Sequence, residues 1–144
     1  MTIRFQAMQR LDLRRVREVM HPGIIQIAPG DDLATIAATL ADHAIHCVVV
    51  SAVERTTDGE QVTWKVVTAL DVMCALDAGD GRVTAAELAP GALVTVQAGE
   101  SLSAAVGLMA QHGITHLVVM DRGWPVGVLS ALDVVRAASA ERTG

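Results

Sequence analysis

The sequence predicts a mixed α/β fold made of two copies of a β-α-β-β-α unit. Three observations carry this prediction: an internal repeat spans most of the 144 residues, hydrophobic residues make up 51% of the chain, and aromatic residues only 2%. A chain of this length buries enough surface for a proper core, which we expect to be aliphatic. With 51% hydrophobic and 19% charged residues, the composition excludes a disordered tail or a coiled coil.

Two runs of matching residues define the repeat. The first run aligns, without a gap, Leu33, Leu40, His43 and Ile45 with Leu102, Met109, His112 and Ile114. After an insertion in the first copy, residues 66–72 match residues 128–134. Because self-similarity of this kind indicates repeated structural units, we expect an N-terminal helical or linker segment over 1–15, a first repeat over 16–77, a linker over 78–82 and a second repeat over 83–140.

Each copy shows the same order of strand and helix signals. Short apolar runs predict opening strands at 24–27 and 93–96. Residues 30–32 and 99–101 supply N-cap chemistry before an apolar stripe at helical spacing, and Ala44 and Gly113 end these helices. The remaining elements that we predict are strand pairs at 47–50 with 63–67 and at 117–120 with 126–129, followed by helices near 69–76 and 131–138.

The two copies differ in the connection between their last two strands. Copy two joins these strands tightly through residues 121–123, whereas copy one inserts a polar stretch over 54–61, which predicts a longer, exposed hairpin. Such an insertion is tolerated because a longer loop costs little stability. Four arginines among the first fifteen residues alternate with apolar residues and predict a solvated face on an N-terminal helix.

The repeated feature with chemical content is a hydroxyl residue followed three positions later by an aspartate, at Thr68 and Asp71 and again at Ser130 and Asp133. This spacing is a capping box, which needs no ligand. The same geometry also suits a ligand, because free N–H groups at a helix start favour phosphate and a carboxylate can accept both hydrogen bonds of a ribose diol. Gly127 further predicts that something approaches the backbone closely there.

The ordered motifs resemble a tandem pair of CBS (cystathionine β-synthase-type) domains over residues 16–138. The motifs that carry the resemblance are residues 16–22, residues 94–96 with Gly99, residues 111–119 and residues 127–133. The resemblance implies a stand-alone pair whose two repeats pack through their sheets with pseudo-twofold symmetry. It also implies clefts between the copies that hold AMP, ADP, ATP or S-adenosylmethionine, with no cofactor required.

The family pattern assigns site residues to both copies. It places the better cleft on Thr95, Thr115, His116, Leu117, Ser130 and Asp133. In this cleft Ser130 would meet phosphate or ribose, and Asp133 would meet the ribose hydroxyls. It places a weaker cleft on Gln26, Ile45, His46, Cys47, Lys65, Thr68 and Asp71. The first copy departs from the second by carrying Lys65 in place of Gly127 and Gln26 in place of Thr95. Lys65 either crowds its cleft or directs its ammonium at a polyphosphate.

Several other functions are disfavoured by composition and motifs. A net charge of −5 works against nucleic-acid binding, and no apolar run approaches the length of a membrane span. Cys47 and Cys74 lie in apolar stretches, so we expect them to be reduced and buried in a cytoplasmic protein. The histidine pairs at 43 and 46 and at 112 and 116 lack further ligands for zinc. No catalytic motif is present, so we expect no enzyme.

The sequence thus predicts a sensor of adenosine-type small molecules that signals to a protein partner in trans. We also expect a homodimer, because the last helix carries apolar and small residues beyond the needs of its own core, at Val134, Val135, Ala137 and Ala138. The alternative is a structural or interaction module that dimerises through its helices and binds no ligand, in which case the hydroxyl and aspartate residues are caps alone.

Overall fold

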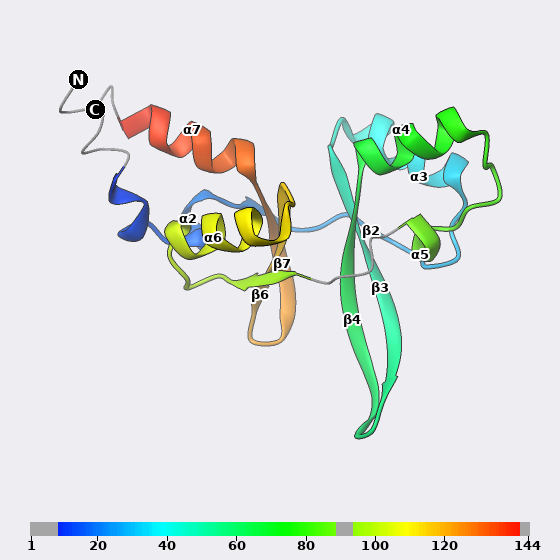
Figure 1. Cartoon of the computed structure of the whole chain (residues 1–144), viewed down its shortest axis with the longest axis horizontal. Helices are drawn as coiled ribbons and strands as arrows, with labels where there is room; N and C mark the ends of the chain where they lie inside the picture. The colour runs from blue at the N-terminus through cyan, green and yellow to red at the C-terminus, as the bar shows by residue number, and fades with distance from the viewer. Residues whose placement is uncertain (1–8, 89–93, 142–144) are drawn as a thin grey trace. The chain divides into compact units, whose positions relative to one another are not determined.

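The computed structural model describes residues 9–88 and 94–141 and confirms a mixed α/β fold with two sheets (Figure 1). Contacts divide the chain into two units. Unit 1 takes the residues up to 23 and those from 94 onward, and unit 2 takes residues 24–93. Unit 1 is therefore assembled from two separate stretches of sequence, whereas unit 2 is continuous. Among the described residues no helix combines the length and apolar character needed to cross a membrane.

Unit 2 has the predicted order of elements. They are β2 (Gln26–Ile27), α3 (Leu33–His43), β3 (Cys47–Thr56), β4 (Gly59–Thr68), α4 (Ala69–Ala78) and α5 (Ala85–Leu88), of which the sequence did not predict α5. The sheet order is β2-β3-β4, with β2 parallel and β4 antiparallel to β3. The helices cover one sheet face, whose alternating side chains Val48, Val50 and Val67 join Ile36 and Leu40 in an aliphatic core.

The β3–β4 hairpin continues past the part of the unit 2 sheet that the helices cover (Figure 1). Its register runs from Cys47 opposite Thr68 to Thr56 opposite Gly59, so the predicted insertion forms the far end of an unbroken hairpin. This end extends beyond α3 and α4 (Figure 1). Outside the core, Val53 and Val62 face each other across the two strands and remain 63% and 59% exposed.

Helix α3 begins and ends where the N-cap and C-cap signals predict. The N–H of Thr35 donates to the Asp32 carboxylate at 2.9 Å, and this bond holds the pKa of Asp32 below its usual value. The helix ends at Ala44, whose φ of 52° places a residue with a Cβ in the left-handed region. In the equivalent helix of unit 1 this position is Gly113, with φ 63°, where no side chain is strained.

Unit 1 repeats the same order after an additional N-terminal part. That part consists of a 3-10 helix, η1 (Gln9–Asp12), a short helix, α2 (Val16–Val19), and β1 (His21–Pro22). The repeat itself consists of β5 (Thr95–Gln97), α6 (Leu102–His112), β6 (His116–Asp121), β7 (Trp124–Ser130) and α7 (Ala131–Glu141). The sheet order is β1-β7-β6-β5. Arg122 and Gly123, both with positive φ, make the tight turn that we predicted between β6 and β7.

The stretch from residue 14 to residue 23 is fixed to unit 1 mainly through its backbone. The N–H of Val16 donates to the Glu100 carbonyl and the N–H of Leu102 to the Arg14 carbonyl, each at 2.9 Å. Further along, β1 pairs with β7, and the N–H of Gly23 donates to the Val126 carbonyl at 2.8 Å. The sequence analysis did not predict β1, because a two-residue strand formed by pairing with a distant segment has no local periodicity. Of the expected N-terminal helix, residues 1–8 lie outside the described residues.

One expectation about the cysteines is wrong. Cys47 is half-buried and Cys74 is exposed, so neither thiol is fully buried. The apolar surroundings of Cys74 misled the prediction because α4 carries a row of exposed apolar side chains, with Leu70, Met73 and Leu76 each more than half exposed. An apolar neighbourhood in sequence therefore did not imply burial on this helix.

Candidate functional site

Three predicted residues of the better site share one face of the unit 1 sheet. His116 lies directly opposite Ser130 across β6 and β7, and Thr95 on β5 pairs with Val118. Since side chains alternate along a strand, Thr95, His116 and Ser130 share the face that turns away from the aliphatic core. Leu117 lies on the other face, where its side chain is fully buried in that core. If Leu117 contacts a ligand, it does so through its backbone.

Ser130 and Asp133 form the capping box at the start of α7. The N–H of Ser130 donates to Asp133 Oδ2 at 2.9 Å, and the N–H of Asp133 donates to Ser130 Oγ at 3.1 Å. The N–H of Ala131 is also engaged, because it donates to the Thr115 carbonyl at 2.8 Å. The expectation of free N–H groups for a phosphate is therefore wrong for three N–H groups of this turn, those of Ser130, Ala131 and Asp133. The Ser130 hydroxyl only accepts here, so its own proton has no acceptor among the described residues.

A residue that the sequence analysis left without a role, His21, completes this site. Its Nε2 lies 2.8 Å from Asp133 Oδ1, a distance at which an N–H donates to a carboxylate. The two side chains differ in environment, since that of His21 is 70% exposed and that of Asp133 only 6%. No local signal predicts this contact, because it joins the beginning of the first repeat to the last helix of the second.

The close approach that the sequence predicts at Gly127 is made by the segment of β1. A Cβ atom at this position would meet the backbone carbonyl oxygen of His21, and it would lie 2.9 Å from the Met20 sulfur. The close approach to the backbone is real, but β1 of this chain makes it. The absent side chain of Gly127 is thus explained by strand packing, and it gives no evidence for a ligand.

The capping box of unit 2 uses its atoms differently. Asp71 Oδ2 accepts from both the N–H and the hydroxyl of Thr68, at 2.8 and 3.0 Å, and the N–H of Asp71 donates to Thr68 Oγ1 at 3.3 Å. The Thr68 hydroxyl proton is therefore used within the box. Within the described part of the chain, Asp71 Oδ1 has no hydrogen-bond partner. The two units thus leave different groups available, a hydroxyl proton in unit 1 and a carboxylate oxygen in unit 2.

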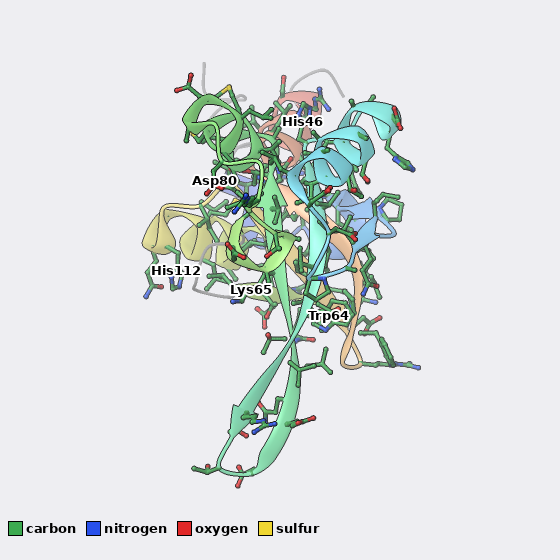
Figure 2. The ribbon with its side chains drawn as sticks, turned by 90° about the vertical axis from the view of Figure 1, so that its right-hand side faces the viewer. His46, Trp64, Lys65, Asp80 and His112 are labelled. Carbon is green, nitrogen blue, oxygen red and sulfur yellow. The ribbon has the colours of Figure 1, made fainter. Side chains whose placement is uncertain are left out.

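The other predicted residues of the weaker site are divided between the two faces of the unit 2 sheet. Gln26, Cys47 and Thr68 share the face away from the helices, because Cys47 pairs with Thr68 and Gln26 with Val49. Lys65 pairs with Val50 on the opposite, helix-covered face, and Figure 2 shows it on the other side of the hairpin from its neighbour Trp64.

Ile45 and His46 lie between the end of α3 and the start of β3. The half-buried side chain of Ile45 packs against the unit 2 core. His46 is exposed, and its carbonyl accepts a hydrogen bond from the N–H of Ala69 at 2.7 Å. Among the predicted residues on these strands, Lys65 alone lies on the opposite sheet face from Thr68. His46 lies next to the capping box of Thr68 and Asp71, because its backbone carbonyl accepts from the N–H of Ala69.

The histidine pairs form no metal centre in the described part of the chain, where no group of three or more His, Cys, Asp or Glu side chains is placed to hold an ion. Two of the ring nitrogens have other neighbours. His43 Nδ1 lies 2.9 Å from the Thr39 carbonyl oxygen, and His116 Nδ1 lies 2.9 Å from Thr115 Oγ1.

Comparisons with solved structures identify the fold. The CBS domain of a bacterial CNNM/CorC family Mg²⁺ transporter in complex with ATP has a TM-score of 0.76 at 18% identity, covering 96% of each chain. The CBS domain pair of protein MJ0100 in complex with 5′-methylthioadenosine and S-adenosyl-L-methionine has a TM-score of 0.73 at 18% identity, covering 89% of this chain and 98% of that one. Hypoxic Response Protein I with two coordinated zinc ions has a TM-score of 0.67 at 23% identity, covering 85% and 98%.

Sequence comparison identifies the family. No curated protein matches the sequence of this chain. The family model of the CBS domain matches it twice, over residues 16–78 and 87–140, and so covers most of its length with two copies. This chain belongs to the CBS domain family, as a tandem pair.

Proposed function

We propose that this chain is a non-catalytic regulatory module that binds an adenosine-containing ligand at Ser130 and Asp133 and passes its state to a protein partner in trans. The observation that carries the proposal is the capping box of unit 1, where the Ser130 hydroxyl proton, which has no acceptor in the described part of the chain, lies one helical turn from the Asp133 carboxylate. A ligand with a phosphate or ribose oxygen and a vicinal diol matches this pair, because it offers both an acceptor and donors.

Structural relatives support this ligand class. One relative holds ATP, and another holds 5′-methylthioadenosine and S-adenosyl-L-methionine. These ligands share an adenosine with a free 2′,3′-diol and differ in what is attached at the 5′ position. The unit 1 site, which also has Thr95 and His116 on the same sheet face, is our preferred site for the shared adenosine. Transmission to a partner requires that the ligand bind one arrangement of the protein better than another.

A thermal-shift panel of AMP, ADP, ATP and S-adenosylmethionine tests the proposal. A ligand at 100 times its dissociation constant stabilises the folded state by about 2.7 kcal/mol, which corresponds to a rise in melting temperature of about 5–11 °C for a chain of this size. Asp133→Ala should remove most of this rise, and Asp71→Ala should leave most of it. Each variant also loses one arm of a capping box, at about 1 kcal/mol, so the ligand-induced difference is the quantity to compare.

The outcomes separate the possible assignments. If Asp71→Ala removes the ligand-induced rise and Asp133→Ala spares it, the ligand binds in unit 2 and our choice of site is reversed. If no adenosine ligand moves the melting temperature of the unchanged protein, the sensor function fails. The capping boxes then have only the structural role that their hydrogen bonds already supply.

We further propose that the chain forms a homodimer through its helices. Matching positions of the repeat are exposed and apolar in both units, with Leu70 and Met73 on α4 corresponding to Leu132 and Val135 on α7. Beside α7, an apolar groove of about 710 Å³ is lined in unit 1 by Leu11, Val106, Met109, Ala110, Val135 and Ala138. Of the residues first expected in the contact, Val134 belongs to the core, whereas Val135 is 62% exposed. A second copy offers the same apolar surfaces in return.

A further inference from the structure

We propose that His21 competes with the ribose diol of the ligand for Asp133, so that a ligand entering the unit 1 site displaces the His21 imidazole. The inference rests on the proposed function and adds a residue that sets how strongly the site selects for a diol. It is carried by the 2.8 Å contact between His21 Nε2 and Asp133 Oδ1.

Both carboxylate oxygens of Asp133 already have a hydrogen-bonding neighbour. Its Oδ2 accepts from the Ser130 N–H, and its Oδ1 faces His21. The carboxylate is nearly buried, at 6% exposure, while the His21 side chain that meets it is 70% exposed. His21 therefore stands on the solvent side of this carboxylate. A hydroxyl that approaches Oδ1 from the side of His21 therefore has to take the place of the imidazole.

His21 can release Asp133 without loss of the strand that carries it. The backbone of β1 is held independently, since His21 pairs with Val128 and the N–H of Gly23 donates to the Val126 carbonyl. The contact between the His21 carbonyl and Gly127 also belongs to the backbone. Displacement therefore needs a change in the side-chain rotamer alone, and an exposed side chain makes such a change on the picosecond to nanosecond timescale.

Unit 2 provides the internal comparison. Asp71 Oδ1 has no partner among the described residues, so a diol would meet no competitor for this oxygen there. The repeat alignment that matches Leu33 with Leu102 matches His21 with Pro90, a residue type with no side-chain donor. The competition is thus a property of unit 1.

ATP and 2′,3′-dideoxy-ATP are the probes that isolate this competition, because only ATP offers hydroxyls to Asp133. Their dissociation constants are measured by calorimetry for the unchanged protein and for His21→Ala. We expect His21→Ala to bind ATP about two- to fivefold more tightly, because a single hydrogen bond contributes roughly 0.5–1 kcal/mol, and to bind 2′,3′-dideoxy-ATP unchanged. His21→Gln retains a donor and should lie between the two proteins. His112→Ala, which removes an exposed histidine at the end of α6, is the matched control and should change neither constant.

The results distinguish this inference from the function on which it rests. Equal ATP affinity of the unchanged protein and His21→Ala would overturn the competition and leave the sensor function standing, provided that Asp133→Ala still weakens binding. Weaker ATP binding by His21→Ala would show that His21 assists the ligand, which also overturns it. If neither ATP nor any other adenosine ligand of the thermal-shift panel binds to any of these proteins, both the inference and the proposed function are overturned. The same comparison in an Asp71→Ala background assigns the change to unit 1.

Discussion

The backbone carbonyl oxygen of His21 lies so close to Gly127 that a Cβ atom there would clash with it. The two residues belong to neighbouring strands of one sheet, since Gly127 pairs with Pro22 in the register of β1 and β7. The strand that carries the proposed competitor for Asp133 is thus positioned by the lack of a side chain on β7. This relationship makes Gly127 a structural requirement of unit 1.

Gly127→Ala should destabilise the protein. The added methyl group would press on a backbone oxygen and on the Met20 sulfur, and neither β1 nor β7 can move without breaking their pairing. We expect a loss of about 1–3 kcal/mol in the free energy of unfolding, as for other overpacked sites, measured by urea denaturation. Gly107→Ala is the matched control, because a Cβ at this exposed position of α6 meets nothing within 4 Å. It should be neutral or stabilising, and an equal loss in both variants would contradict the packing argument.

The C-terminal ends of α3 and α6 should respond in opposite directions to exchange of their cap residues. Ala44→Gly should stabilise the protein by about 0.5–1 kcal/mol, because it relieves a side chain held at positive φ. Gly113→Ala should cost about 1 kcal/mol for the same reason. Denaturation midpoints of the two single variants and of the double variant test this. A double variant far from the sum of the two would show that the ends are coupled, which we do not expect of sites in different units.

Self-association should depend on the exposed apolar positions of α4 and α7. Val135→Glu and Met73→Glu each place a charge on the proposed contact surface, so we expect light scattering to show a dimer for the unchanged protein at micromolar concentration and a monomer for these variants. Val53→Glu, which alters an equally exposed valine on the β3–β4 hairpin, should remain dimeric. A monomeric unchanged protein would refute the dimer.

Zinc content after purification without a chelator should be well below one ion per chain. One structural relative coordinates two zinc ions, but here the described side chains offer no group of three ligands, and structural zinc sites use four. Elemental analysis of the protein, before and after dialysis against a chelator, measures this. Stoichiometric zinc that is lost in a His43→Ala or His112→Ala variant would show that the histidine pairs were wrongly discounted.

Most of the fold could be predicted from the sequence, because repeat, period and capping signals are local. Asp32 and Ser101 cap α3 and α6 as expected, and the tight turn at Arg122 and Gly123 and the long hairpin of the insertion were both predicted. The two-residue strand at His21 was missed. Its structure comes from pairing with β7, whose residues lie more than a hundred positions away, and nothing in residues 16–23 alone encodes that partner.

The sequence could predict which residues form the candidate site, but not which of their hydrogen-bonding atoms are already engaged. The spacing of Ser130 and Asp133 correctly indicated a helix-capping box on a strand end, and the register brings His116 beside it. Spacing does not show which lone pairs are already used. The contact of His21 with Asp133, and the different use of the hydroxyl protons of Thr68 and Ser130, depend on side-chain positions that no sequence pattern specifies.

The divided sequence of unit 1 has a consequence for synthesis. Residues up to 23 are made first, yet their partners lie beyond residue 94, and the whole of unit 2 is synthesised between them. At 5–20 residues per second, the first strand waits about 5–22 s before the whole of β7 (Trp124–Ser130) has been made and can pair with it. Unit 2 is continuous and can fold during that interval. A fragment that contains the second repeat alone would lack β1, and with it His21, so the unit 1 sheet would expose the edge of β7 that β1 covers in the whole chain.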